Sequence, residues 1–236
     1  MQERYLGDSH DFIKYALLRQ LNDDLSLRLG VNWYLARPEN VDRPGNNDGE
    51  KRHHLKGGVW RTLDPDLFDL ISQFEDPAAR RIDHIAEWGL LPRSTAYHSE
   101  SICSSDRQVW HANGLQALKD CGLVFLDPDN GFEVPSMTSR TAPKYALYSE
   151  AADYVRMGKV VVGIQFARQC DPIARAHEVR DRLLDVCGTG AILPVVRGRV
   201  APNILFVTVA PPDLDGAVRT SIKRFCDKSE KVELVA

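Results

Sequence analysis

Apolar positions along the chain recur either at the spacing of an amphipathic helix or in short runs that are apolar at every residue. Apolar residues three or four positions apart predict helices, and segments with this spacing are 11–27, 65–74, 77–88, 107–120, 149–157, 173–186 and 214–225. Short apolar or β-branched runs predict strands, and these are 31–35, part of 94–103, Leu123–Leu126, 159–166, 191–196 and 204–209.

Strands and helices alternate through most of the chain, and the last two strands are joined by the polar segment 197–203 as a hairpin. This order predicts an α/β fold with a mostly parallel sheet and an antiparallel hairpin near the C-terminus. We expect one domain over residues 1–236, elaborated or carrying an insertion at about 36–105, and a frayed tail after Asp227. The stretch 36–58, rich in Pro, Gly, Asn and charge, is long for a loop, which points to function or disorder.

Composition narrows the class of protein. The net charge is −3, which counts against a protein whose whole surface binds nucleic acid. The five cysteines form no C-x-x-C pair, so free thiols are expected rather than a zinc site or a disulfide framework. The sequence also shows no leader and no apolar run long enough to cross a bilayer. We therefore expect a cytoplasmic, bacterial-type protein with no membrane partner.

The acidic loop that follows the run Leu123–Leu126 carries the strongest functional signal. It reads Asp127-Pro128-Asp129-Asn130-Gly131-Phe132-Glu133. Open α/β sheets bind ligands at the carboxyl ends of their strands, so Asp127 would accept hydrogen bonds from a ligand's amino or hydroxyl group, or share a divalent ion with Asp129. The same residue types are common turn formers, so a strand end without further function is the alternative.

A second cluster of polar residues stands where the first helix begins. Asp8, Asp11 and Lys14 lie three residues apart, and residues three or four apart share a helix face. The cluster would bind an anionic ligand through helix amides and the lysine. Alternatively, Asp8 or Ser9 caps the helix and Asp11 pairs with Lys14. We expect His10 to lie on the surface.

Gln165 and Arg168 stand at the end of the predicted strand 159–166. They would face the same crevice as Asp127 if the two strands are parallel neighbours. A solvated arginine is the alternative for Arg168.

Four segments, in order, resemble the large-subunit ribosomal RNA adenine-N6 methyltransferases. The family's Gly-Asn-x-x-Asp-x-x-Lys helix is matched by Gly7, Asp8, Asp11 and Lys14, and its Ala-Asp-Gly-Phe-Gln-x-Leu segment by residues 112–118. Its strand ending in Asp-Pro-Pro-Tyr is matched by the loop Asp127-Pro128-Asp129-Asn130, and its final Asn-Pro-Pro strand end by 204–209 with Pro211-Pro212.

The resemblance implies a Rossmann-like methyltransferase fold, S-adenosylmethionine as cofactor and a nucleic-acid or nucleotide-like amine, RNA or DNA included, as substrate. Carried over by residue, Asp8, Asp11, Lys14, Asn113 and Gly114 serve the cofactor. The loop Asp127-Pro128-Asp129-Asn130 is catalytic, with Asp127 and a proline carbonyl holding the amine. Phe132, Gln165 and Arg168 would line the substrate side, with Phe132 replacing the aromatic that stacks on the base.

The chain departs from the family at four points, the first being Asn113, which stands where the family has an acid. Asp129 replaces the second proline, Asn130 replaces the stacking aromatic, and 31–35 is followed by Ala36-Arg37-Pro38-Glu39 instead of a glycine-rich turn. Two other functions therefore stay open. One is a metal-dependent phosphoesterase or nuclease, with Asp8, Asp11, Asp127, Asp129 and Glu133 around Mg²⁺. The other is a binding module without catalysis on the same fold.

Overall fold

Seven strands form one mixed sheet in the computed structural model, which describes residues 2–36, 52–102, 106–191 and 193–236. The strand order across the described sheet is β2-β1-β3-β6-β8-β7-β9. The bounds are β1 Leu29–Asn32, β2 Ala96–His98, β3 Leu123–Leu126, β6 Val160–Ala167, β7 Val195–Gly198, β8 Asn203–Val209 and β9 Val232–Val235. The first four strands of the order run parallel, and β8, β7 and β9 follow as antiparallel neighbours.

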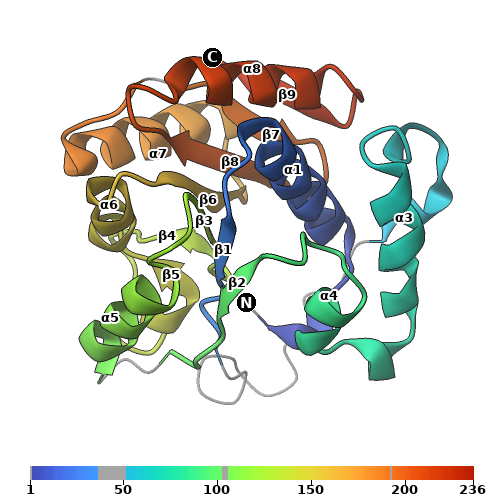
Figure 1. Cartoon of the computed structure of the whole chain (residues 1–236), viewed down its shortest axis with the longest axis horizontal. Helices are drawn as coiled ribbons and strands as arrows, with labels where there is room; N and C mark the ends of the chain where they lie inside the picture. Colours follow the sequence, from blue (N-terminus) through green and yellow to red (C-terminus); the bar gives the residue numbers. More distant parts are fainter. Residues whose placement is uncertain (1, 37–51, 103–105, 192) are drawn as a thin grey trace.

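Helices cover both faces of this sheet (Figure 1). The helices are α1 Ser9–Leu25, α3 Pro65–Ile71, α4 Asp83–Glu87, α5 Arg107–Ala117, α6 Tyr148–Arg156, α7 Pro172–Cys187 and α8 Asp215–Cys226. Two further short strands, β4 Gly131–Phe132 and β5 Tyr145–Ala146, pair with each other beside the main sheet. No helix among the described residues has the length and apolar character needed to cross a membrane.

Alternate residues of the strands enter two separate cores. In β3, Leu123 and Phe125 pack with α1, α3 and α8, whereas Val124 and Leu126 pack with α5, α6 and α7. Side chains of a strand alternate between faces, and all four are fully buried. A strand that is apolar at every position therefore lies in the middle of a sheet covered on both sides, as its sequence predicted.

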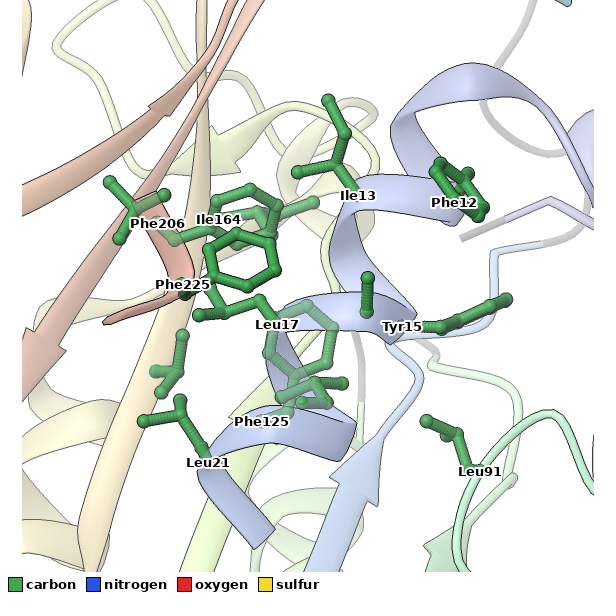
Figure 2. Packing of buried hydrophobic residues seen from close by; sticks show 14 of the residues in the cluster. Phe12, Ile13, Tyr15, Leu17, Leu21, Leu91, Phe125, Ile164, Phe206 and Phe225 are labelled. Carbon is green, nitrogen blue, oxygen red and sulfur yellow. The ribbon is translucent and has the colours of Figure 1, made fainter. Parts of the chain in front are cut away.

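Helix α1 is buried on nearly all sides along its first three turns. Figure 2 shows Ile13, Leu17 and Leu21 facing the sheet, where Phe125, Ile164 and Phe206 lie, with Phe225 of α8 among them. Phe12 points to the other side of α1, where its ring stacks on His54 at 5.4 Å between ring centroids. A helix enclosed in this way is held in place from both sides, so polar residues at its N-terminus have fixed positions.

The chain reverses direction across the sheet at β1. From β1 it goes outward to the edge strand β2 and then returns to pair β3 with the other side of β1. In open α/β sheets the crevice beside such a reversal, at the carboxyl ends of the strands, is the usual ligand site. Asp127 follows β3 at this edge, and its backbone N–H donates to the carbonyl of Asn32 at the end of β1.

Two predicted strands have other bounds for a local reason, and the prediction of a frayed tail is wrong. The strand expected at 31–35 is β1, Leu29–Asn32, because Tyr34 has a φ of 46°, outside the extended region. The strand expected at 191–196 is β7, which begins after Pro194, a residue that cannot donate to the ladder. The tail expected to fray forms β9, paired with β7.

Other expectations hold in outline. The hairpin between β7 and β8 is antiparallel, with Val196 opposite Phe206. The helix expected at 77–88 is divided into a short 3-10 turn and α4. Most of the loop expected at 36–58 lies outside the described residues.

Candidate functional site

The N-terminus of α1 is closed by side chains of its own first turn. Asp8 is the N-cap, and its Oδ1 accepts hydrogen bonds from the backbone N–H groups of His10 at 2.8 Å and Asp11 at 3.0 Å. The Oδ2 of Asp11 accepts from the N–H of Gly7 at 2.9 Å. Such contacts satisfy amide donors that a helix leaves unpaired. The predicted capping role of Asp8 is confirmed, and these amides are consequently not open to an anionic ligand.

Lys14 lies between two carboxylates that come from distant parts of the sequence. Its Nζ donates to Asp11 Oδ1 at 2.6 Å and to Asp127 Oδ2 at 2.9 Å, and all three side chains are buried. The pair with Asp11 was predicted from the helix spacing. The pair with Asp127 arises because α1 packs against β3 with its N-terminus at the carboxyl edge of the sheet.

Burial and charge together set the protonation of this group. Burial alone would lower the pKa of Lys14, but the charges of Asp11 and Asp127 outweigh it and hold the pKa above its ordinary value. Burial raises the pKa of Asp11 to about 6, and the carboxylates of Asp8 and Asp127 add to this rise while Lys14 opposes it. The pKa of Asp11 therefore lies above that of an ordinary aspartate, whereas Lys14 stays charged.

His10 is buried and joins α1 to the loop between β7 and β8, contrary to its expected surface position. Its Nδ1 lies 3.2 Å from Asp8 Oδ2, and its Nε2 lies 2.9 Å from the carbonyl oxygen of Pro202. Both ring nitrogens thus face acceptors, which favours the doubly protonated ring. Burial opposes the charge, but the contacts with Asp8 and Pro202 raise the pKa of His10 above its usual value.

A pocket of about 530 Å³ opens above these residues. This volume is in the range of sites that bind one small organic ligand. The described residues that line it come from the N-terminal segment, α1, the loop after β3, the segment before β5, the second half of β6 with the residues after it, and the β7–β8 loop with the start of β8: Gln2, Arg4, Tyr5, Asp8, His10, Asp11, Lys14, Asp127, Pro128, Asp129, Asn130, Lys144, Ile164, Phe166, Ala167, Arg168, Gln169, Pro202 and Ile204. We call this the Asp127 pocket.

The Asp127 pocket offers two acceptor oxygens, Asp127 Oδ1 and the carbonyl of Pro128. Asp127 Oδ2 is held by Lys14, whereas Oδ1 accepts no hydrogen bond from a residue that the structure describes. The carbonyl of Pro128 is likewise not an acceptor for any described donor. Three carboxylates (Asp8, Asp11, Asp127) meet two cations (Lys14, His10) at the floor of the pocket, so the floor suits a ligand that donates hydrogen bonds or carries positive charge.

One wall of the pocket is apolar and carries an arginine. The rings of Phe166 and His10 are perpendicular, with centroids 5.3 Å apart, and the guanidinium carbon of Arg168 lies over the Phe166 ring, 5.3 Å from its centroid. Gln169, which follows, has a φ of 53°, a conformation that non-glycine residues adopt rarely.

Asp129 and Asn130 also line the pocket, and both have partners. Asp129 Oδ2 accepts from Gln2 Nε2 at 2.5 Å and lies 3.9 Å from Lys144 Nζ. The N–H of Asn130 donates to the carbonyl of Lys144 at 2.9 Å. The loop after β3 is therefore fixed to the segment before β5 and to the N-terminal segment.

Phe132 and Gln165 do not line the Asp127 pocket. Phe132 is buried, and its ring stacks on Tyr148 at 4.9 Å between centroids. Gln165 Oε1 accepts from the N–H of Phe132 at 3.0 Å, beside Gly131, where a Cβ would lie 2.5 Å from that oxygen. The two residues fix the turn that carries the loop and do not face a ligand there.

Asn113 and Gly114 lie on α5, away from the pocket that holds Asp8, Asp11 and Lys14. Asn113 Nδ2 donates to Glu100 Oε2 at 3.0 Å, and a Cβ on Gly114 would lie 3.0 Å from His98. The residues that the resemblance assigns to a cofactor are thus divided between two places.

The acidic residues do not form the metal site considered above. The ammonium group of Lys14 fills the space between Asp11 and Asp127, and Glu133 accepts from the N–H of Tyr148 instead of facing the pocket. No group of three or more His, Cys, Asp or Glu side chains in the described ranges could hold a metal ion. The donor set therefore does not fit Mg²⁺.

Several lining residues had no signal in the sequence. Arg4, Lys144 and Pro202 reach the pocket from segments far from Asp127 in the sequence. Phe166 and Gln169 could have been found, because they flank residues already placed at the end of a parallel strand.

Comparison with protein-family models and with curated proteins found no match for this chain.

Proposed function

We propose that the protein is an S-adenosylmethionine-dependent N-methyltransferase that acts on the exocyclic amine of a nucleotide-like substrate. The observation that carries the proposal is the position of Asp127, a buried carboxylate at the carboxyl end of β3 with one oxygen fixed by Lys14 and the other without a described donor. The sequence resemblance and the reversal of the chain at β1 agree with it.

The pocket residues would position the amine. Its two N–H groups would donate to Asp127 Oδ1 and to the carbonyl of Pro128, which sets the plane of the amine and the direction of its lone pair. The ring that carries the amine would lie against the apolar wall at Phe166. Lys14 keeps Asp127 in place, and Asp127 Oδ1 is placed to take the proton that the amine loses on methylation.

The cofactor would supply an electrophilic methyl group. The excess of carboxylates over cations at the pocket floor fits the positive charge of a sulfonium. Lys14, the residue that the resemblance assigns to the cofactor, is held by Asp11 and Asp127, so its contribution is to the charge and shape of the floor.

Calorimetric titration of S-adenosylmethionine, with transfer of labelled methyl groups to nucleotides and short RNA, tests the proposal. We expect wild-type protein to bind the cofactor at micromolar concentration and Asp127→Asn to keep this binding. Transfer should fall about 10²–10³-fold in Asp127→Asn, as when a preorganised polar contact to the reacting group is lost. Asp69→Asn, which changes an exposed aspartate paired with Arg61, is the matched control.

Two results would contradict this function. If S-adenosylmethionine does not bind at millimolar concentration, the protein is not a methyltransferase that uses this cofactor. If the cofactor binds equally well to wild type and to Asp127→Asn, and neither protein transfers a methyl group to any amine, a binding module without catalysis is favoured.

A further inference from the structure

The rim of the Asp127 pocket differs in charge from its floor. The floor residues Asp8, His10, Asp11, Lys14 and Asp127 are all buried. At the rim, Arg168 is exposed, and Arg4 and Lys144 are half-buried. A ligand that reaches from floor to rim therefore meets an excess of carboxylates first and cations afterwards.

Arg168 is the rim cation best placed to bind an anion. Its guanidinium lies over Phe166 and makes no hydrogen bond to a residue that the structure describes. Arginine presents its donors in a planar fork that matches phosphate oxygens. Gln169, next in the chain, has a left-handed backbone conformation with a φ of 53° and lines the same pocket.

We propose that Arg168, with Arg4 and Lys144, forms a phosphate-binding lip, so that the pocket selects a phosphorylated nucleotide over its nucleoside. This inference rests on the proposed function, because the amine at Asp127 sets the orientation of the ligand. The phosphate group belongs to a free nucleotide or to a nucleic-acid chain, and the net charge of −3 favours the free nucleotide.

The test is calorimetric binding of AMP, adenosine, IMP and the trinucleotide ApApA to wild-type protein and two variants. Arg168→Gln removes the lip arginine. Arg182→Gln is the matched control, since Arg182 is also exposed and also lies over an aromatic ring, with its guanidinium carbon 4.8 Å from the centroid of Tyr148, but does not line the pocket.

In wild type and in Arg182→Gln we expect AMP to bind about tenfold more tightly than adenosine, as for a hydrogen bond between charged groups. In Arg168→Gln this advantage should fall to about twofold or less, while the affinity for adenosine stays the same. ApApA should bind no more tightly than AMP.

The outcomes separate this inference from the proposed function. If wild type binds AMP and adenosine with equal affinity, or if Arg168→Gln keeps the preference for AMP, the phosphate-binding role of the rim is wrong. Neither result contradicts amine recognition at Asp127. Equal affinities for AMP and IMP, which lacks the exocyclic amine, overturn amine recognition and leave the lip standing. Tight binding of ApApA without binding of AMP assigns the phosphate to a nucleic-acid chain, and failure of all four ligands at millimolar concentration overturns both.

Discussion

Lys14 and Asp127 are 113 positions apart in the sequence, and their Nζ and Oδ2 atoms lie 2.9 Å apart in a buried position. The contact joins the second turn of α1 to the end of β3 and thus links the two segments that the sequence marked as functional. An ion pair buried to this extent costs desolvation on both sides, and removal of one partner leaves the other charge without compensation.

Lys14→Met should therefore be strongly destabilising. It leaves Asp11 and Asp127 buried beside an apolar side chain, and we expect the free energy of unfolding to fall by about 3–5 kcal/mol. Urea denaturation at neutral pH measures it. Lys223→Met is the matched control, because Lys223 pairs with Asp227 at 2.6 Å but on the exposed surface of α8, where such a pair contributes at most about 1 kcal/mol. Similar losses in the two variants would contradict the role given to Lys14.

His54 should make the stability of the protein fall on acidification. Its ring is buried against Phe12, its Nδ1 lies 3.0 Å from Ser9 Oγ, and burial lowers its pKa from 6.5 to about 4. Between these values the unfolded chain binds the proton and the folded chain does not. The contribution of neutral His54 to the free energy of unfolding is therefore complete above pH 6.5. It is lost as the pH falls towards 4, by up to about 1.4 kcal/mol per pH unit.

Urea denaturation of wild type and His54→Asn at a series of pH values from 4.5 to 7.5 checks this expectation. Asparagine keeps a polar partner for Ser9 but does not titrate, so the slope of the unfolding free energy with pH should decrease. His53→Asn, a change at the exposed neighbouring residue, should leave the slope as in wild type. An unchanged slope in His54→Asn would show that His54 is not held neutral by the fold.

The strand β9 leads to a prediction that separates an ordered C-terminus from a frayed one. Val232 is buried, whereas Leu234, which follows two residues later in the same strand, is exposed. Val232→Asp should destabilise the protein by about 2–4 kcal/mol, since it buries a charge, while Leu234→Asp should cost less than about 1 kcal/mol. The melting temperatures of the two variants and of wild type, measured by thermal denaturation, check this difference. If both variants melt like wild type, the segment does not pair with β7.

Sequence reasoning succeeded where a few neighbouring residues decide the structure. Leu123–Leu126 has the predicted bounds, Asp8 caps α1, and Asp11 pairs with Lys14. Each of these depends on local hydrogen bonding or on the spacing of residues in one element. The mostly parallel sheet with its antiparallel hairpin also followed from the order of apolar segments.

It failed where a side chain's surroundings come from another part of the chain. His10 was expected at the surface, but Pro202, 192 positions away, accepts its hydrogen bond. Phe132 was expected near a ligand, but it lies under Gly163 of β6. Such contacts depend on how helices and strands pack against one another. The spacing of residues within one segment does not predict that packing.

The packing of Phe132 against Gly163 gives a last prediction, which tests whether this aromatic belongs to the core or to the ligand site. A Cβ at Gly163 would lie 2.5 Å from Phe132 Cζ, so Gly163→Ala should lower the free energy of unfolding by about 1–3 kcal/mol through overpacking. Phe132→Leu in the same chain should recover part of this loss, because it removes the ring atoms that clash. The control is Gly216→Ala on α8, where no atom lies within 4 Å of the added Cβ and the change should stabilise the helix by about 0.5–1 kcal/mol. If the losses in free energy of unfolding of the two single variants simply add in the double variant, Phe132 and Gly163 are not in contact. A Phe132 that faces a ligand would then be the better interpretation.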